Sequence, residues 1–146
     1  DLNWVQLMNA YSCTECGRCT SECPANQTGK KLSPRKIMMD TRDRLEKVSL
    51  NISKNKGEFI DDGDRLLDNY ISKEELWACT SCNACVEACP INIDPLSIIM
   101  DMRQYLIMEE SSAHPDLNNM MNNIENNGAP WPYNQLDREL WAQETQ

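Results

Sequence analysis

Eight cysteines, arranged in two ladders of identical spacing, are the residues of this sequence best suited to chemistry. Each ladder reads C-x2-C-x2-C-x3-C-P. The first ladder contains Cys13, Cys16, Cys19 and Cys23 before Pro24, and the second ladder contains Cys79, Cys82, Cys85 and Cys89 before Pro90. Cysteines in such numbers form disulfides, bind zinc or hold iron–sulfur clusters, and their spacing separates these uses.

The spacing favours iron–sulfur clusters. Three thiolates two residues apart can wrap around one 4Fe–4S cluster, and the whole run is typical of bacterial ferredoxins. Structural zinc usually takes two separated C-x2-C pairs, which would leave the middle and last cysteines of each ladder without a role. Disulfides belong to oxidising compartments and rarely join cysteines this close in sequence. We therefore predict two 4Fe–4S clusters as cofactors, with all eight cysteines as metal ligands.

The fourth cysteine of each ladder is predicted to serve the other ladder's cluster. In ferredoxins with two clusters, the last cysteine of each run binds the opposite cluster. Carried over to this sequence, that rule assigns one cluster to Cys13, Cys16, Cys19 and Cys89, and the second cluster to Cys79, Cys82, Cys85 and Cys23. The two halves would then depend on each other. No catalytic residue is predicted, because every cysteine is already a ligand.

Helices are expected to position the ladders. The segments SPRKIMMDTRDRL (33–45) and DPLSIIMDMRQYL (94–106) share Pro, Ile, Met, Asp, Arg and Leu in register, which makes them an internal repeat. Ser33 and Asp94 are predicted N-caps, each followed by proline at the first helical position. We call these two helices the trailing helices, because each follows a ladder.

A second pair of helices, the leading helices, is expected before the ladders. The first is predicted over residues 2–11. The second is predicted over 73–77, where Ser72 and Glu75 match a capping box. Two more helices are expected over 115–126 and 136–144, and almost nothing in the sequence is typical of a strand.

These elements predict an all-α fold, with two pseudo-symmetric helical halves around two iron–sulfur clusters. We expect residues 1–130 to form an α-helical dicluster ferredoxin domain. Residues 131–146 are expected to be a C-terminal tail, or a linker to a downstream domain that this sequence does not contain.

Charge and hydropathy limit the partners. The formal net charge of −9 argues against nucleic acid and anionic lipid, because both need clustered Lys and Arg. The apolar runs are far too short to cross a bilayer, and no segment has the pattern of a signal peptide. We expect a cytoplasmic location, or one at the cytoplasmic face of a membrane, with any membrane contact made by a partner or by a missing region.

One basic group stands out in this acidic chain. Lys30, Lys31, Arg35 and Lys36 lie just after the first ladder. The simpler interpretation is a solvated start of a helix. The alternative is a patch that guides an acidic electron-transfer partner or makes reduction of a cluster easier.

The chain resembles the α-helical ferredoxin module found in the C subunits of heterodisulfide reductase and of anaerobic glycerol-3-phosphate dehydrogenase. The resemblance covers residues 4–131 and rests on the two ladders, the helices after Pro34 and Pro95, and NNGAPW at 126–131. It implies an electron-transfer module that works with redox partner proteins or fused catalytic domains, flavin- or quinone-linked. Larger relatives add CCG domains and membrane helices, which are not found in this sequence.

Three functions remain open from the sequence. The first is a one-electron relay within a larger iron–sulfur oxidoreductase, which the pairing of two clusters favours. The second is an iron–sulfur subunit with a catalytic thiol or disulfide role. The third is a structural role for the clusters, or a redox sensor that controls another protein. Whether the chain belongs to an enzyme is not decided by these residues.

Overall fold

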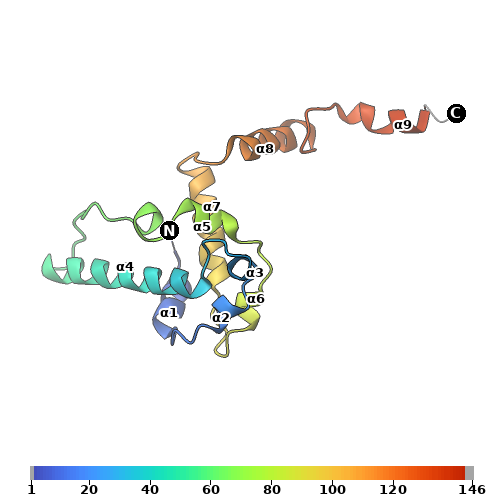
Figure 1. The fold of residues 1–146 in the computed structure, drawn as a ribbon. Helices are drawn as coiled ribbons and strands as arrows, with labels where there is room; N and C mark the ends of the chain where they lie inside the picture. Colours follow the sequence, from blue (N-terminus) through green and yellow to red (C-terminus); the bar gives the residue numbers. More distant parts are fainter. Residues whose placement is uncertain (1, 144–146) are drawn as a thin grey trace. The chain divides into compact units, whose positions relative to one another are not determined.

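The computed structural model describes residues 2–143, and nearly all of its regular structure is helical (Figure 1). In chain order, the elements are α1 (Trp4–Ser12), α2 (Arg18–Ser21), α3 (Pro24–Gln27), α4 (Pro34–Lys54), the irregular turn η1 (Leu66–Tyr70), α5 (Lys73–Ala78), α6 (Ala84–Glu87), α7 (Pro95–Met108), α8 (Pro115–Asn127), the 3₁₀ helix η2 (Gln135–Glu139) and α9 (Leu140–Gln143). Within the described residues, β pairing is limited to one isolated bridge between Leu67 and Ile71. The predicted all-α class is confirmed.

The trailing helices α4 and α7 begin where the sequence predicts. Ser33 Oγ accepts a hydrogen bond from the backbone N–H of Lys36 at 3.3 Å. Asp94 Oδ1 accepts one from Ser97 at 3.0 Å. These bonds satisfy N–H groups that have no partner inside the helix. Helix α4 continues to Lys54, beyond the stretch in which its apolar pattern is clear.

Both leading helices, α1 and α5, begin with a capping box. In α5 the backbone N–H of Ser72 donates to Glu75 Oε2 at 2.8 Å, and the N–H of Glu75 donates back to Ser72 Oγ at 3.3 Å. In α1 the same reciprocal bonds join Asn3 and Gln6, at 2.7 and 3.0 Å. From the sequence we predict the capping box of α5 but not that of α1, where asparagine takes the N-cap position that serine occupies in α5. Helix α1 therefore begins at Trp4, two residues later than predicted.

The chain divides into two compact units, one that ends at Tyr105 and one that begins at Leu106. The first unit contains both ladders and a core of buried apolar side chains. Its largest members are Leu32, Ile37, Met38, Ile71, Leu76, Ile98 and Ile99. The predicted boundary after residue 130 lies inside the second unit and stays a prediction.

The second unit contains α8, η2 and α9. Helix α8 ends at Gly128, whose φ of 65° is the left-handed conformation that a glycine C-cap supplies at little cost. The helix predicted over 136–144 is divided, because its first turn is the 3₁₀ helix η2; residue 144 lies outside the described residues. In the described part of the chain, no helix combines the length and the apolar character needed to span a membrane.

Candidate iron–sulfur sites

One cavity brings together the first three cysteines of the first ladder and the last two cysteines of the second. We call it the first cavity. Its lining cysteines are Cys13, Cys16, Cys19, Cys85 and Cys89. Side chains from α4 and α7 complete its wall, among them Arg35, Met38 and Pro95.

A second cavity has the reciprocal lining. Its cysteines are Cys23, Cys79, Cys82 and Cys85. Leu32, Pro34, Leu96 and Ile99 complete most of its wall. Each cavity thus contains the fourth cysteine of the opposite ladder. Because Cys85 lines both, the two cavities are neighbours.

Equivalent positions of the repeat line the two cavities. Arg35 and Met38 of α4 line the first cavity, and their counterparts in the repeat, Leu96 and Ile99 of α7, line the second. The first proline of each trailing helix lines the opposite cavity. Pro95 of α7 lines the first cavity, and Pro34 of α4 lines the second. Each trailing helix therefore contributes its first turns to one cavity and its first proline to the other.

The backbone of the two ladder loops is also alike. Glu15 and Gly17 in the first loop have φ angles of 58° and 81°, and Ser81 and Asn83 in the second have 55° and 61°. In each loop, residues with a left-handed backbone alternate with residues that are not left-handed. This alternation turns successive backbone N–H groups toward the same point, where they can bind an anionic group. One such N–H, that of Ser81, lies 3.4 Å from Cys79 Sγ. N–H groups in this position stabilise thiolates and influence the reduction potential of a cluster.

Burial differs along each ladder. Cys16 and Cys82, the second cysteine of each ladder, are exposed, whereas Cys23 and Cys85 are buried. Burial raises the pKa of the Cys85 thiol to about 12, helped by the neighbouring thiols of Cys79 and Cys19. The backbone N–H of Ala84 and the side chain of Thr80 lower the pKa of Cys82. A buried thiol such as Cys85 keeps its proton at neutral pH, so binding of metal there must release a proton.

The donor set of each cavity fits an iron–sulfur cluster. All eight thiols are free, and they line cavity walls. Among residues 2–143, no three Cys, His, Asp or Glu side chains converge closely enough to hold a single metal ion. Soft thiolates spread around a volume suit a polynuclear iron–sulfur group.

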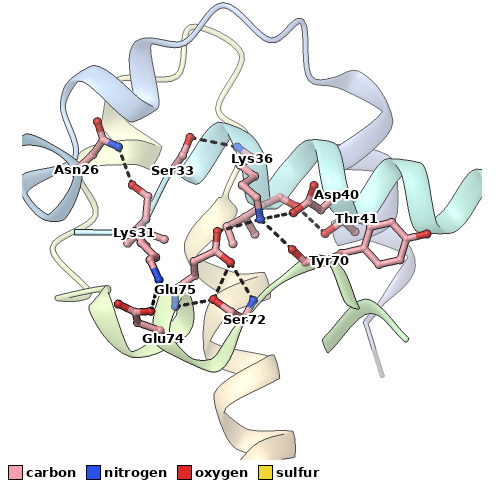
Figure 2. Close-up of polar contacts among 12 residues, drawn as sticks. Asn26, Lys31, Ser33, Lys36, Asp40, Thr41, Tyr70, Ser72, Glu74 and Glu75 are labelled. Atoms are coloured by element: carbon pink, nitrogen blue, oxygen red, sulfur yellow. Dashed lines mark hydrogen bonds and ion pairs between the residues drawn. The ribbon is translucent and has the colours of Figure 1, made fainter. Parts of the chain in front are cut away.

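Lys36 ties the trailing helix of one ladder to the leading helix of the other (Figure 2). Its Nζ lies 2.8 Å from Asp40 Oδ2 and 2.9 Å from Glu75 Oε1, and it donates to the carbonyl of Tyr70 at 2.8 Å. Burial opposes ionisation of Glu75, but the N–H of Ser72 and the ammonium of Lys36 outweigh it and lower the Glu75 pKa. Helix α5 is thereby held against α4 just before the second ladder begins.

The reciprocal link joins α1 to α7. Gln6 Nε2 donates to Asp101 Oδ2 at 2.6 Å, and Gln6 is only 3% exposed. Asp101 and Asp40 occupy the same position of the repeat. In both links, the third residue of a leading helix contacts the trailing helix that follows the other ladder.

Two arginines at equivalent positions of the repeat hold the start of each ladder. Arg42 Nη2 lies 2.5 Å from Glu15 Oε1, within the first ladder loop. Arg103 donates to the carbonyls of Leu76, at 3.0 and 2.6 Å, and of Cys79, at 2.5 Å. Its guanidinium also lies over the Trp77 ring, 4.9 Å from the centroid. Sequence reasoning assigned no role to either arginine, although their shared register was a usable signal.

The basic group after the first ladder is divided in the structure. Lys31 pairs with Glu74 at 2.9 Å (Figure 2), and Lys36 belongs to the network described above. Arg35 differs from both lysines because it lines the first cavity. The four residues therefore do not act as one solvated patch.

Comparison with known proteins agrees with these sites. Residues 12–93, more than half of the chain, match the 4Fe-4S dicluster domain family. The chain is 32% identical to a probable iron-sulfur-binding oxidoreductase, FadF, of Bacillus subtilis, and 29% identical to the EtfAB:quinone oxidoreductase of Syntrophomonas wolfei. Both alignments cover 99% of this chain, but only 24% and 23% of the relative.

A shorter archaeal relative is also similar. The chain is 27% identical to the C2 subunit of the H(2)/formate:CoB-CoM heterodisulfide,ferredoxin reductase of Methanococcus maripaludis, over 75% of this chain and 47% of the relative. The chain spans about a quarter of the length of the two bacterial relatives and about half of the archaeal one. The match to residues 12–93 includes every cysteine of both ladders, and the chain belongs to the 4Fe-4S dicluster domain family.

Proposed function

We propose that this chain is an electron-transfer module that relays single electrons through two 4Fe–4S clusters within a larger iron–sulfur oxidoreductase. The observation that carries the proposal is the reciprocal lining of two adjacent cavities. A bound 4Fe–4S cluster supplies reversible one-electron chemistry. The protein's part is to supply thiolates, to hold two such groups side by side, and to limit the access of water.

The proposed ligands follow the crossed arrangement. Cys13, Cys16 and Cys19 would share the first cavity with Cys89, and Cys79, Cys82 and Cys85 would share the second with Cys23. The cavity linings support this assignment, including the position of each fourth cysteine. Cys85 lines both cavities, and this supports a short path between the two clusters.

The proposed partners are redox proteins or domains linked to a flavin or a quinone. One relative is named as an EtfAB:quinone oxidoreductase and another as a subunit of a heterodisulfide and ferredoxin reductase, and both names describe redox proteins. Exposure of Cys16 and Cys82 would bring one edge of each cluster near the surface, where electrons can enter and leave. We place the module in the cytoplasm or at the cytoplasmic face of a membrane.

Anaerobic reconstitution with iron and sulfide tests the proposal. The expected product contains about eight irons and eight labile sulfides per chain, because four of each build one cluster. Both clusters should be reduced and reoxidised reversibly in a titration followed by electron paramagnetic resonance (EPR). A protein that binds two zinc ions and no sulfide, or whose clusters do not cycle, would contradict the relay.

A further inference from the structure

Arg35 places a cation at one of the two cavities. The residue lies in the first turn of α4, and its side chain lines the first cavity. Its Nη1 is 3.7 Å from the point that a Cβ at Gly17 would occupy. Gly17 lies between Cys16 and Cys19, so the guanidinium lies against the loop that carries the first ladder's ligands.

The charge of Arg35 is not neutralised by a nearby carboxylate. Within residues 2–143, no Asp or Glu lies within salt-bridge distance of its guanidinium. Its backbone N–H donates to Thr20 Oγ1 at 3.3 Å, a bond that leaves the side chain uncommitted. The carboxylate that lines the same cavity, Glu15, is paired with Arg42 at 2.5 Å. The wall of the first cavity therefore includes a guanidinium that forms no ion pair with a carboxylate of residues 2–143.

The second cavity has no such cation. Leu96 occupies the position of the repeat that Arg35 occupies in α4, and no Lys, Arg, Asp or Glu of the described chain lines that cavity. Lys30 and Lys31 line a separate groove, with Trp77 and Ala78. Arg103 donates to the carbonyl of Cys79 in the second ladder, but unlike Arg35 it lines neither of the two cavities.

We propose that Arg35 sets the reduction potential of the cluster in the first cavity and so favours that cavity as the site of the electron in the half-reduced protein. The inference rests on the proposed relay. Reduction adds one negative charge to a group already held by four thiolates, and a nearby cation stabilises the added charge. In the internal step, the second cluster loses one electron and the first gains it, with no bond made or broken. Arg35 is exposed, so salt should weaken its influence.

EPR-monitored titration of the reconstituted chain, with dithionite as the reductant, tests this role. Arg35→Leu should lower the potential of the first cluster and leave the second unchanged. We expect a change of about three- to tenfold in the one-electron equilibrium, where tenfold is about 59 mV. Arg35→Lys should retain most of the wild-type potential. The signals are assigned with Cys16→Ser and Cys82→Ser, one for each cavity.

The repeat provides a reciprocal variant. Leu96→Arg adds a cation to the second cavity and should raise the potential of the second cluster, even if Arg35→Leu impairs assembly. High salt should reduce the difference between wild type and Arg35→Leu. Two reversible clusters whose potentials are unaffected by both substitutions would overturn this inference and leave the relay standing. Clusters that do not cycle in the wild-type chain would overturn both.

Discussion

At the scale of single residues, the last cysteine of each ladder lines the cavity of the other ladder. Cys89 lines the first cavity and Cys23 lines the second, so neither joins the first three cysteines of its own ladder. If these cysteines are exchanged as ligands, as proposed above, the two sites depend chemically on each other, and single substitutions can test that dependence.

Cys89→Ser is expected to disturb the cluster of the first cavity, although Cys89 belongs to the second ladder. A serine oxygen is a harder ligand than a thiolate, so iron bound there should have a lower potential or be lost. Cys23→Ser is the matched variant and should disturb the second cavity. EPR spectra of both reconstituted variants show which of the two cluster signals each substitution changes. Damage confined to the cluster of the mutated ladder would rule out the exchange.

Arg42 and Arg103 occupy equivalent positions of the repeat, so the contributions of their side chains to stability can be compared. Arg103→Gln removes hydrogen bonds to the carbonyls of Leu76 and Cys79 and should cost about 2–3 kcal/mol of folding free energy. Arg42→Gln removes a partly exposed pair with Glu15 and should cost at most about 1 kcal/mol.

Native-state hydrogen exchange of the reconstituted variants measures both effects, and only Arg103→Gln should loosen the second ladder. Equal effects of the two substitutions would show that the carbonyl contacts of Arg103 stabilise the fold no more than the partly exposed ion pair of Arg42 does.

At the scale of helices, the two ladders are joined by contacts between the leading helix of one and the trailing helix of the other. Helix α1 reaches α7 through Gln6 and Asp101, and α5 reaches α4 through Glu75 and Lys36. In each case the contact uses the same residue that closes a capping box. The start of a leading helix and its docking are therefore coupled.

A double-mutant cycle on Gln6 and Asp101 should measure the strength of the contact between α1 and α7. The bond is formed by a nearly buried amide and a carboxylate, so we expect an interaction energy of roughly 1–3 kcal/mol between Gln6→Ala and Asp101→Ala. Asn3→Ala is the control, because it removes the cap of α1 but not the contact with α7. Hydrogen exchange of α1 and α7 supplies the free energies. Additive effects of the two substitutions would show that α1 docks without this bond.

At the scale of the whole molecule, the first unit is held together at the two cavities as well as by its apolar core. Each cavity joins segments that are far apart in the sequence, and buried thiols such as Cys23 and Cys85 lie between them. In a small domain of this kind, free energy of metal binding becomes free energy of folding.

Removal of the clusters is therefore expected to lower the melting temperature and to loosen the loops between Cys13 and Cys23 and between Cys79 and Cys89. The capped helix α4 should keep part of its protection, because its hydrogen bonds and apolar face do not involve cysteine. The measurement compares reconstituted with chelator-treated protein, both kept anaerobic. Thermal unfolding gives the two melting temperatures, and amide exchange gives the protection of each loop and helix. An apo protein with the same melting temperature and protection would show that the clusters are dispensable to the fold.

Features that depend on residues close together in the chain can be predicted from the sequence alone. The spacing of the ladders identifies the cofactor, because a loop that wraps a cluster is built from residues two or three apart. The starts of α4, α5 and α7 follow from caps that act within one turn. The family follows from the same local patterns.

Contacts between side chains that are far apart in the chain become visible only in the folded structure. Arg35, Lys31 and Lys36 look alike in sequence, yet one lines a cavity and the other two form ion pairs. The positions of Cys23 and Cys89 opposite the other ladder were carried over from ferredoxins, and the cavities supply the geometry for testing that assignment. The physical reason is that such contacts join residues far apart in the chain. They arise from helix packing, which local spacing does not encode.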